Sequence, residues 1–93
     1  MKLGTFNKQP GERLSNSIVY DDALDEGDSV ETLVSCTVEP AGLEVTGMLV
    51  DGSRVRVFAE GGADGQVYKI TVVVSTQGGE RFEDELLCRV KEL

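Results

Sequence analysis

Apolar and polar residues alternate along most of the chain, and this period of two constrains the fold more than any other feature of the sequence. Successive side chains of a β-strand point to opposite faces, so alternation indicates a strand with one buried face. The pattern predicts six strands, over residues 12–20, 30–38, 43–49, 55–59, 68–74 and 82–90. No segment shows the spacing of an amphipathic helix, so we expect an all-β protein.

Turn-forming residues separate the predicted strands. Pro40 ends the second strand, and Asp51-Gly52 predicts a type I′ hairpin, in which both central residues need positive φ. Glycine-rich bends at residues 61–65 and 77–79 precede the last two strands. Six or seven short strands with frequent turn signals are typical of an immunoglobulin-like antiparallel β-sandwich, with a small closed barrel as the alternative.

Two segments and one residue depart from the alternation. Residues 1–11 contain few apolar groups and are predicted to form a flexible N-terminal arm before a sandwich domain at residues 12–93. The acidic stretch 21–28 is predicted to be a solvated loop or a single helical turn. Asp84 falls on an inward-facing position of the last strand, so we expect a β-bulge or a late strand start there.

Length and charge weigh against several classes of function. The 93 residues make one small domain, and a hydrophobic content of 40 % suffices for a single thin core. Nine basic residues against 17 acidic ones give a net charge of −8, which disfavours binding to nucleic acid or to an anionic membrane surface. No segment is apolar enough for a signal peptide or a membrane span, so we expect synthesis in the cytoplasm.

Residues that could perform catalysis or bind metal are scarce. The chain has no histidine, which removes the Ser–His–Asp and Cys–His arrangements and the commonest transition-metal ligand. Cys36 and Cys88 fall within predicted strands without a metal-binding or redox spacing, so we expect buried, reduced thiols. The acidic stretch 21–28 lacks the aspartate spacing that folds a loop around calcium. We therefore expect neither an enzyme nor a bound cofactor or metal.

Tyr68 follows the glycine-rich bend at the start of the predicted fifth strand. In immunoglobulin-like sandwiches, a tyrosine near the start of the penultimate strand hydrogen-bonds a nearby backbone group and fixes the corner. The alternative role, a catalytic phenol, lacks a neighbouring base. Tyr68 is therefore predicted to be a structural corner residue.

A protein interface is predicted from apolar residues at outward-facing positions of three strands. These residues are Met48, Val50, Val67, Val73 and Leu87. If the strands at 43–49, 68–74 and 82–90 share one sheet, the five side chains cluster on one exposed face, which is typical of a protein-binding surface. Scattered exposure of single apolar residues, which is ordinary in strands, is the alternative.

The order of several short motifs resembles that of small tailed-phage structural proteins of the fibre–tail adaptor or head–tail type. The motifs span nearly all of residues 8–93 and are Lys8–Leu14, Ile18–Asp21, Gly27–Val30, Val38–Leu43, Gly61-Gly62-x-x-Gly65-x-x-Tyr68 and Gly79-x-x-Phe82-x-Asp84-Glu85. The chain departs from these proteins at Asn16, where an aromatic residue is usual, and at Tyr20, where tryptophan is frequent. The resemblance implies an immunoglobulin-like fold and no catalytic residues.

The resemblance also implies a function, that of a virion or prophage structural protein. Such an adaptor would contact other tail, neck or fibre proteins and further copies of itself, and we expect the contacts at the arm 1–11, at the loop 21–28 and on the outward apolar face. A carbohydrate-binding or adhesion module is the alternative. Its binding site would need stacked aromatic rings, for which Tyr20 and Phe58 are the main candidates.

Overall fold

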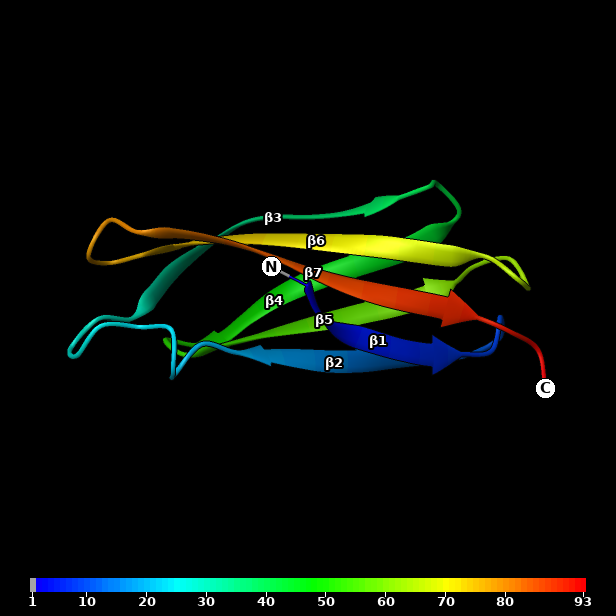
Figure 1. Cartoon of the computed structure of the whole chain (residues 1–93), viewed down its shortest axis with the longest axis horizontal. Coiled ribbons are helices and arrows are strands. Elements are labelled where there is room, and N and C mark those ends of the chain that lie inside the picture. Colours follow the sequence, from blue (N-terminus) through cyan, green and yellow to red (C-terminus); the bar gives the residue numbers. More distant parts are fainter. Residues whose placement is uncertain (1) are drawn as a thin grey trace.

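Within residues 2–93, the computed structural model contains seven strands and no helix, hence no helix that could cross a membrane (Figure 1). The strands are β1 (Lys2–Lys8), β2 (Arg13–Val19), β3 (Val30–Glu39), β4 (Leu43–Asp51), β5 (Arg54–Gly61), β6 (Val67–Thr76) and β7 (Arg81–Val90). They form a four-stranded sheet in the order β1-β7-β6-β3 and a three-stranded sheet in the order β2-β5-β4. The predicted all-β sandwich is thereby confirmed.

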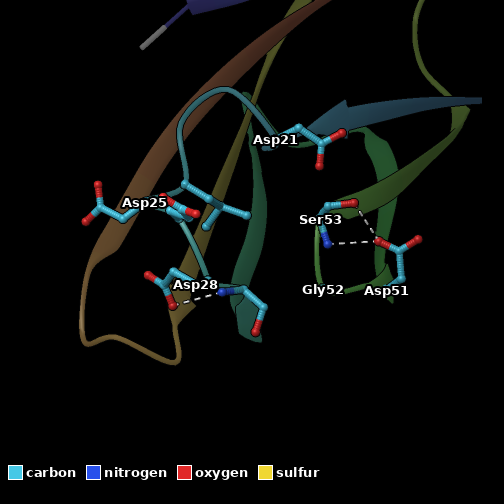
Figure 2. Close-up of a pocket in the computed structure, with 10 residues that line it drawn as sticks. Asp21, Asp25, Asp28, Asp51, Gly52 and Ser53 are labelled. Atoms are coloured by element: carbon cyan, nitrogen blue, oxygen red, sulfur yellow. Dashed lines mark hydrogen bonds between the residues drawn. The ribbon is translucent and has the colours of Figure 1, made fainter.

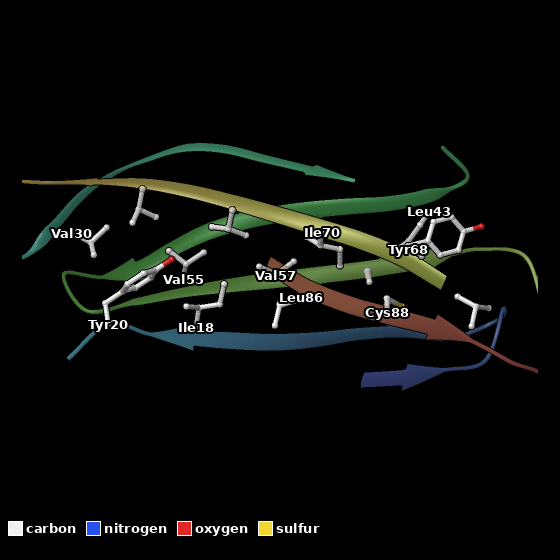
Figure 3. Close-up of a cluster of buried hydrophobic side chains, with 14 residues drawn as sticks. Ile18, Tyr20, Val30, Leu43, Val55, Val57, Tyr68, Ile70, Leu86 and Cys88 are labelled. Carbon is white, nitrogen blue, oxygen red and sulfur yellow. The ribbon is translucent and has the colours of Figure 1, made fainter. Parts of the chain in front are cut away.

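The two sheets enclose one elongated core (Figure 3). The alternate residues of β5, β6 and β7 that face inward form its centre, and Val55, Ile70, Val72 and Cys88 are fully buried. Aliphatic side chains dominate this core, as the scarcity of aromatic residues requires. The molecule measures 44 × 18 × 18 Å, so both sheets run along its long axis and the loops gather at its two ends (Figure 1).

The strand order bears on the finer fold assignment. The sheets β2-β5-β4 and β3-β6-β7 have the order of the B-E-D and C-F-G sheets of immunoglobulin constant-type domains. The first strand, β1, joins the second of these sheets and runs parallel to β7. We retain the immunoglobulin-like assignment as a prediction supported by this order.

The N-terminal segment differs from the predicted flexible arm. Lys2–Lys8 forms β1, while Met1 lies outside the described residues. Phe6 packs against the core, and the buried ammonium of Lys8 donates hydrogen bonds to the carbonyls of Gln9 and Gly61. The alternation of β1 was not recognised in the sequence because Lys8 occupies an inward position that an apolar residue would normally fill. Backbone carbonyls accept hydrogen bonds from its ammonium group and so compensate the burial of its charge.

Two strands differ from the predicted pattern of inward residues. The alternation over residues 30–38 predicts Val34 on the inner face, but in β3 register shifts after Val30 and after Leu33 turn Val34 outward, and Leu33 packs on the core in its place. The expected irregularity at Asp84 is absent, because β7 keeps an even register with β6 through this residue. A β-bulge reverses the parity of a strand without a signal in the hydrophobic pattern, which explains the error in β3.

Asp84 is instead accommodated on the inner face of the sandwich, where it is 5 % exposed. The nearby Tyr20 ring is also buried and stacks on Phe82, with ring centroids 6.0 Å apart. Burial, followed by the Asp84 carboxylate, raises the pKa of Tyr20 well above its ordinary value. The Tyr20 hydroxyl nevertheless completes no hydrogen bond of good geometry within the described structure.

The turn between β4 and β5 is not the predicted type I′ turn. Neither Asp51 nor Gly52 has positive φ. The Asp51 carboxylate instead accepts hydrogen bonds from the backbone N–H and the hydroxyl of Ser53, at 2.8 and 2.9 Å. An aspartate that bonds its own chain two residues later is an alternative way to close a tight turn.

Tyr68 lies at the opposite end of the molecule, beside the bend between β5 and β6. The ring is 1 % exposed, and its hydroxyl accepts a hydrogen bond of 2.9 Å from the backbone N–H of Ala63. Gly62 in this bend has φ of +96°, and a Cβ there would lie 2.7 Å from a methyl of Val90. The bend therefore depends on a glycine backbone and on the tyrosine hydroxyl.

Replacing Tyr68 by phenylalanine should lower the free energy of unfolding by about 1 to 2 kcal/mol, because the Ala63 N–H loses its acceptor. The comparison variant is Tyr20→Phe, which removes an equally buried hydroxyl that lies beside the Asp84 carboxylate but completes no hydrogen bond of good geometry within the described structure, so it should lower the stability by less than Tyr68→Phe does. Urea unfolding of the three proteins measures both effects. Equal losses in the two variants would contradict this account of the corner.

Candidate protein-contact surfaces

The five residues of the predicted interface lie on two different sheets. Val67 and Val73 of β6 and Leu87 of β7 belong to the four-stranded sheet, whereas Met48 and Val50 of β4 belong to the three-stranded sheet. The expectation that their strands share a sheet is wrong, because β4 pairs with β5 in the other layer. The five side chains therefore do not form one surface.

On the outer face of the four-stranded sheet, ion pairs separate the apolar side chains. The ammonium of Lys69 lies 3.1 Å from the Glu39 carboxylate and 3.4 Å from that of Glu85. Its hydrogen bonds to these two residues, first that to Glu39, raise the pKa of Lys69. Lys69 stands between Val67 and Val73 along β6, so these ion pairs divide the apolar residues.

The outer face of the three-stranded sheet combines exposed apolar residues with arginines. We call it the arginine face, and it consists of Val19, Met48, Val50, Arg54, Arg56 and Phe58. Across the sheet, Arg56 lies opposite Met48 and Val19 lies opposite Arg54. The guanidinium of Arg56 lies 5.3 Å from the centroid of the Phe58 ring, and that of Arg13 lies 4.2 Å from it. This face therefore presents apolar area and positive charge together.

The sequence prediction found only part of the arginine face. It included Met48 and Val50 but missed Val19, Arg54 and Arg56. A signal was present, because residues 54–58 read Arg-x-Arg-x-Phe with all three named residues on one side of the strand. A search for outward apolar residues alone could not find the cationic half of this surface.

The other distinctive surface is the acidic end, which we define as the loops 21–28, 51–53 and 77–80. Backbone hydrogen bonds from Val30 to Gly52 and from Gln77 to Ser29 hold the three loops together. The acidic end contains seven of the 17 acidic residues and none of the nine basic ones, so it carries −7 of the net charge of −8. The rest of the chain is nearly neutral.

A shallow depression of about 550 Å³ opens at the acidic end (Figure 2). Asp21, Asp25, Asp28 and Asp51 line it. Among the described residues, no group of three or more such side chains converges in a way that could hold a metal ion. The acidic end is therefore an anionic surface and shows no geometry of a cation site.

Asp28 locks two of these loops together. Its carboxylate oxygen accepts hydrogen bonds of 2.8 Å from the backbone N–H groups of Ser29 and Gly78. Partial desolvation acts to raise the pKa of Asp28, but hydrogen bonds from Gly78, Thr76 and Ser29 together outweigh it and lower the pKa. The charged form of Asp28 is thus favoured in the folded protein.

A second contact at the acidic end, between Asp25 and Glu80, raises a pKa instead of lowering it. The negative charge of Asp25, followed by a hydrogen bond between the two side chains, raises the pKa of Glu80. Like charges are therefore crowded where loops 21–28 and 77–80 meet. Asp22 and Glu26 are exposed and take no part in these contacts.

The two aromatic rings that were candidates for a carbohydrate site, those of Tyr20 and Phe58, are not accessible to a sugar. Tyr20 is 2 % exposed in the core, and the Phe58 ring has the Arg13 guanidinium 4.2 Å from its centroid. Sugar rings stack on open aromatic faces, which neither side chain offers. The two cysteines are free thiols, and burial raises the pKa of both.

Comparison with known proteins gives one result. A family model described as "Podophage GP4 fiber-tail adaptor protein gp77" matches residues 8–89. The match covers most of the chain and includes β2 to β6 entire. Among curated proteins, no match was found.

Replacing Asp28 by asparagine should destabilise the protein at pH 7. The amide oxygen of the new side chain can still accept both hydrogen bonds, but it lacks the negative charge that strengthens them. The folded-state pKa of Asp28 is lowered, so its contribution is present above the unfolded pKa of about 3.9 and is lost as the pH falls through the folded value. The difference in free energy of unfolding between wild type and Asp28→Asn should therefore shrink below about pH 4.

Urea unfolding at pH 7, 4 and 2.5 measures this difference. The control is Asp22→Asn, which removes an exposed charge outside these contacts and should change stability little at any of the three pH values. A difference between wild type and Asp28→Asn that stays constant with pH would contradict the assignment.

Proposed function

Because the chain belongs to the podophage GP4 fiber-tail adaptor family, we propose that it is a non-enzymatic component of the phage particle that acts through protein–protein contacts. Its partners are other structural proteins of the tail, neck or fibre region. The surfaces described above support contact as the mode of action.

The arginine face carries this proposal. The exposed fractions of Val19, Met48 and Val50 are 60, 46 and 41 %. Val19 lies opposite Arg54 and Met48 lies opposite Arg56, and Val50 follows Met48 two residues later on β4. Arginine, methionine and aromatic residues are enriched in protein interfaces, and arginine is among the residues that most often form binding hot spots. A contiguous patch of this composition favours a docking surface over scattered exposure.

The chemistry of the thiols supports a non-enzymatic role. A cysteine acts as a nucleophile in its thiolate form, and catalytic cysteines have a lowered pKa. In this chain burial raises the pKa of both Cys36 and Cys88. They therefore favour the neutral, unreactive form and act as core residues.

The test is incorporation of variants into phage particles. Met48→Asp places a negative charge in the arginine face and should reduce the amount of this chain in purified particles about tenfold, which corresponds to about 1.4 kcal/mol of binding free energy. Mass spectrometry of the particles, with urea unfolding of the purified variant, separates loss of docking from loss of folding.

The matched control is Val34→Asp. Val34 is exposed to 45 %, almost the same as Met48 at 46 %, and it also lies on an edge strand, but in the opposite sheet. This variant should be incorporated like the wild type. Normal incorporation of a stably folded Met48→Asp variant would remove the arginine face from the proposal.

A further inference from the structure

We infer that the arginine face docks a second copy of this chain, with the acidic end of one copy lying on the arginine face of the other. The inference deepens the proposed function, since it rests on the arginine face being a contact surface and names one occupant of it. It concerns the purified chain alone, so it is tested separately from incorporation into particles.

Charge complementarity points to this occupant. The acidic end holds −7 of the chain's charge of −8, and among its seven acidic side chains Asp22 and Glu26 are exposed and outside the contacts that hold the loops. Within the described residues, Arg56 makes a contact with the Phe58 ring and no ion pair. Each surface thus offers charged groups that the other could pair.

The two surfaces also lie next to each other on the molecule. Arg54 follows Ser53 of the acidic end directly, and Arg56 lies about 7 Å further along β5 at the usual rise of a strand. Two copies that overlap by these ends, with their three-stranded sheets facing, would place each acidic end on the partner's arginine face. Such an arrangement is two-fold symmetric and closed, which is the commonest form of a homodimer.

The contact would remove an unfavourable feature from each copy. The side chains of Asp25 and Glu80 lie close together, and the Asp25 charge raises the pKa of Glu80, so like charges are crowded at this point of the acidic end. Guanidinium groups from a second copy would offset these like charges, and Val19, Met48 and Val50 would be withdrawn from water. The remaining repulsion between the two net negative copies is screened beyond about 8 Å at physiological ionic strength.

A charge exchange between two variants tests the inference. One variant carries Asp22→Lys and Glu26→Lys, and the other carries Arg54→Glu and Arg56→Glu. Sedimentation equilibrium over a range of protein concentrations should show a wild-type dimer. For each variant alone, the dissociation constant of the dimer should be at least about tenfold higher than that of the wild type. An equimolar mixture of the two variants should restore the dimer, because both contacts then pair opposite charges again.

The matched control carries Glu44→Lys and Glu92→Lys, which change the net charge by the same amount as the acidic-end variant but lie at the other end of the molecule. It should dimerise at least as well as the wild type. Urea unfolding verifies that all variants are folded. A wild type that stays monomeric, or a mixture of folded variants that stays monomeric, would overturn the inference, while reduced incorporation of Met48→Asp would then leave the proposed function standing.

Discussion

Burial of the inner face of β6 is the constraint on which the rest of the structure depends. Tyr68, Ile70, Val72 and Val74 of this strand are all at most 1 % exposed. The strand pairs with β3 on one side and with β7 on the other, and through β7 it also holds β1. Since a shift of one residue would move every one of these side chains to the outer face, the core fixes the register of the whole four-stranded sheet.

The same period of two fixes what β5 can present to solvent. Its inward residues Val55, Val57 and Ala59 are buried against the other sheet, so Arg54 and Arg56 must face outward. β5 is the central strand of its sheet, held by β2 and β4 on both sides. The arginine face is therefore built on rigid backbone, and docking on it would cost less conformational entropy than docking on a loop.

Six of the seven strands, β2 to β7, could be predicted from the sequence because the alternation within each is carried by its own residues. Their grouping into sheets could not, since the pairing of β2 with β5 in one sheet and of β3 with β6 in the other joins segments that are distant in the sequence. This is why Met48 and Val67 were placed together in one predicted interface. The parity of both residues was correct, as both are exposed, but parity does not identify the sheet.

Polar residues at inward positions account for the other differences. Lys8 is buried among backbone carbonyls, and Asp84 is buried beside the Tyr20 hydroxyl. A prediction that expects only apolar residues at inward positions places Lys8 in a flexible arm and expects a strand irregularity at Asp84. In both cases a partner from a distant part of the chain made the position tolerable, and such partners do not appear in the local pattern.

The acidic end shows how folding and contact place different demands on the same loops. Asp28 and Asp51 accept hydrogen bonds from the backbone, so their charges stabilise the turns in which they lie. Asp22 and Glu26 add negative charge without such bonds, and Asp25 and Glu80 crowd each other. Neither feature stabilises the fold. The concentration of these charges beside a surface with Arg54 and Arg56 is what a contact between copies would require, because a carboxylate that adds nothing to folding in the monomer gains a favourable pairing once a guanidinium faces it.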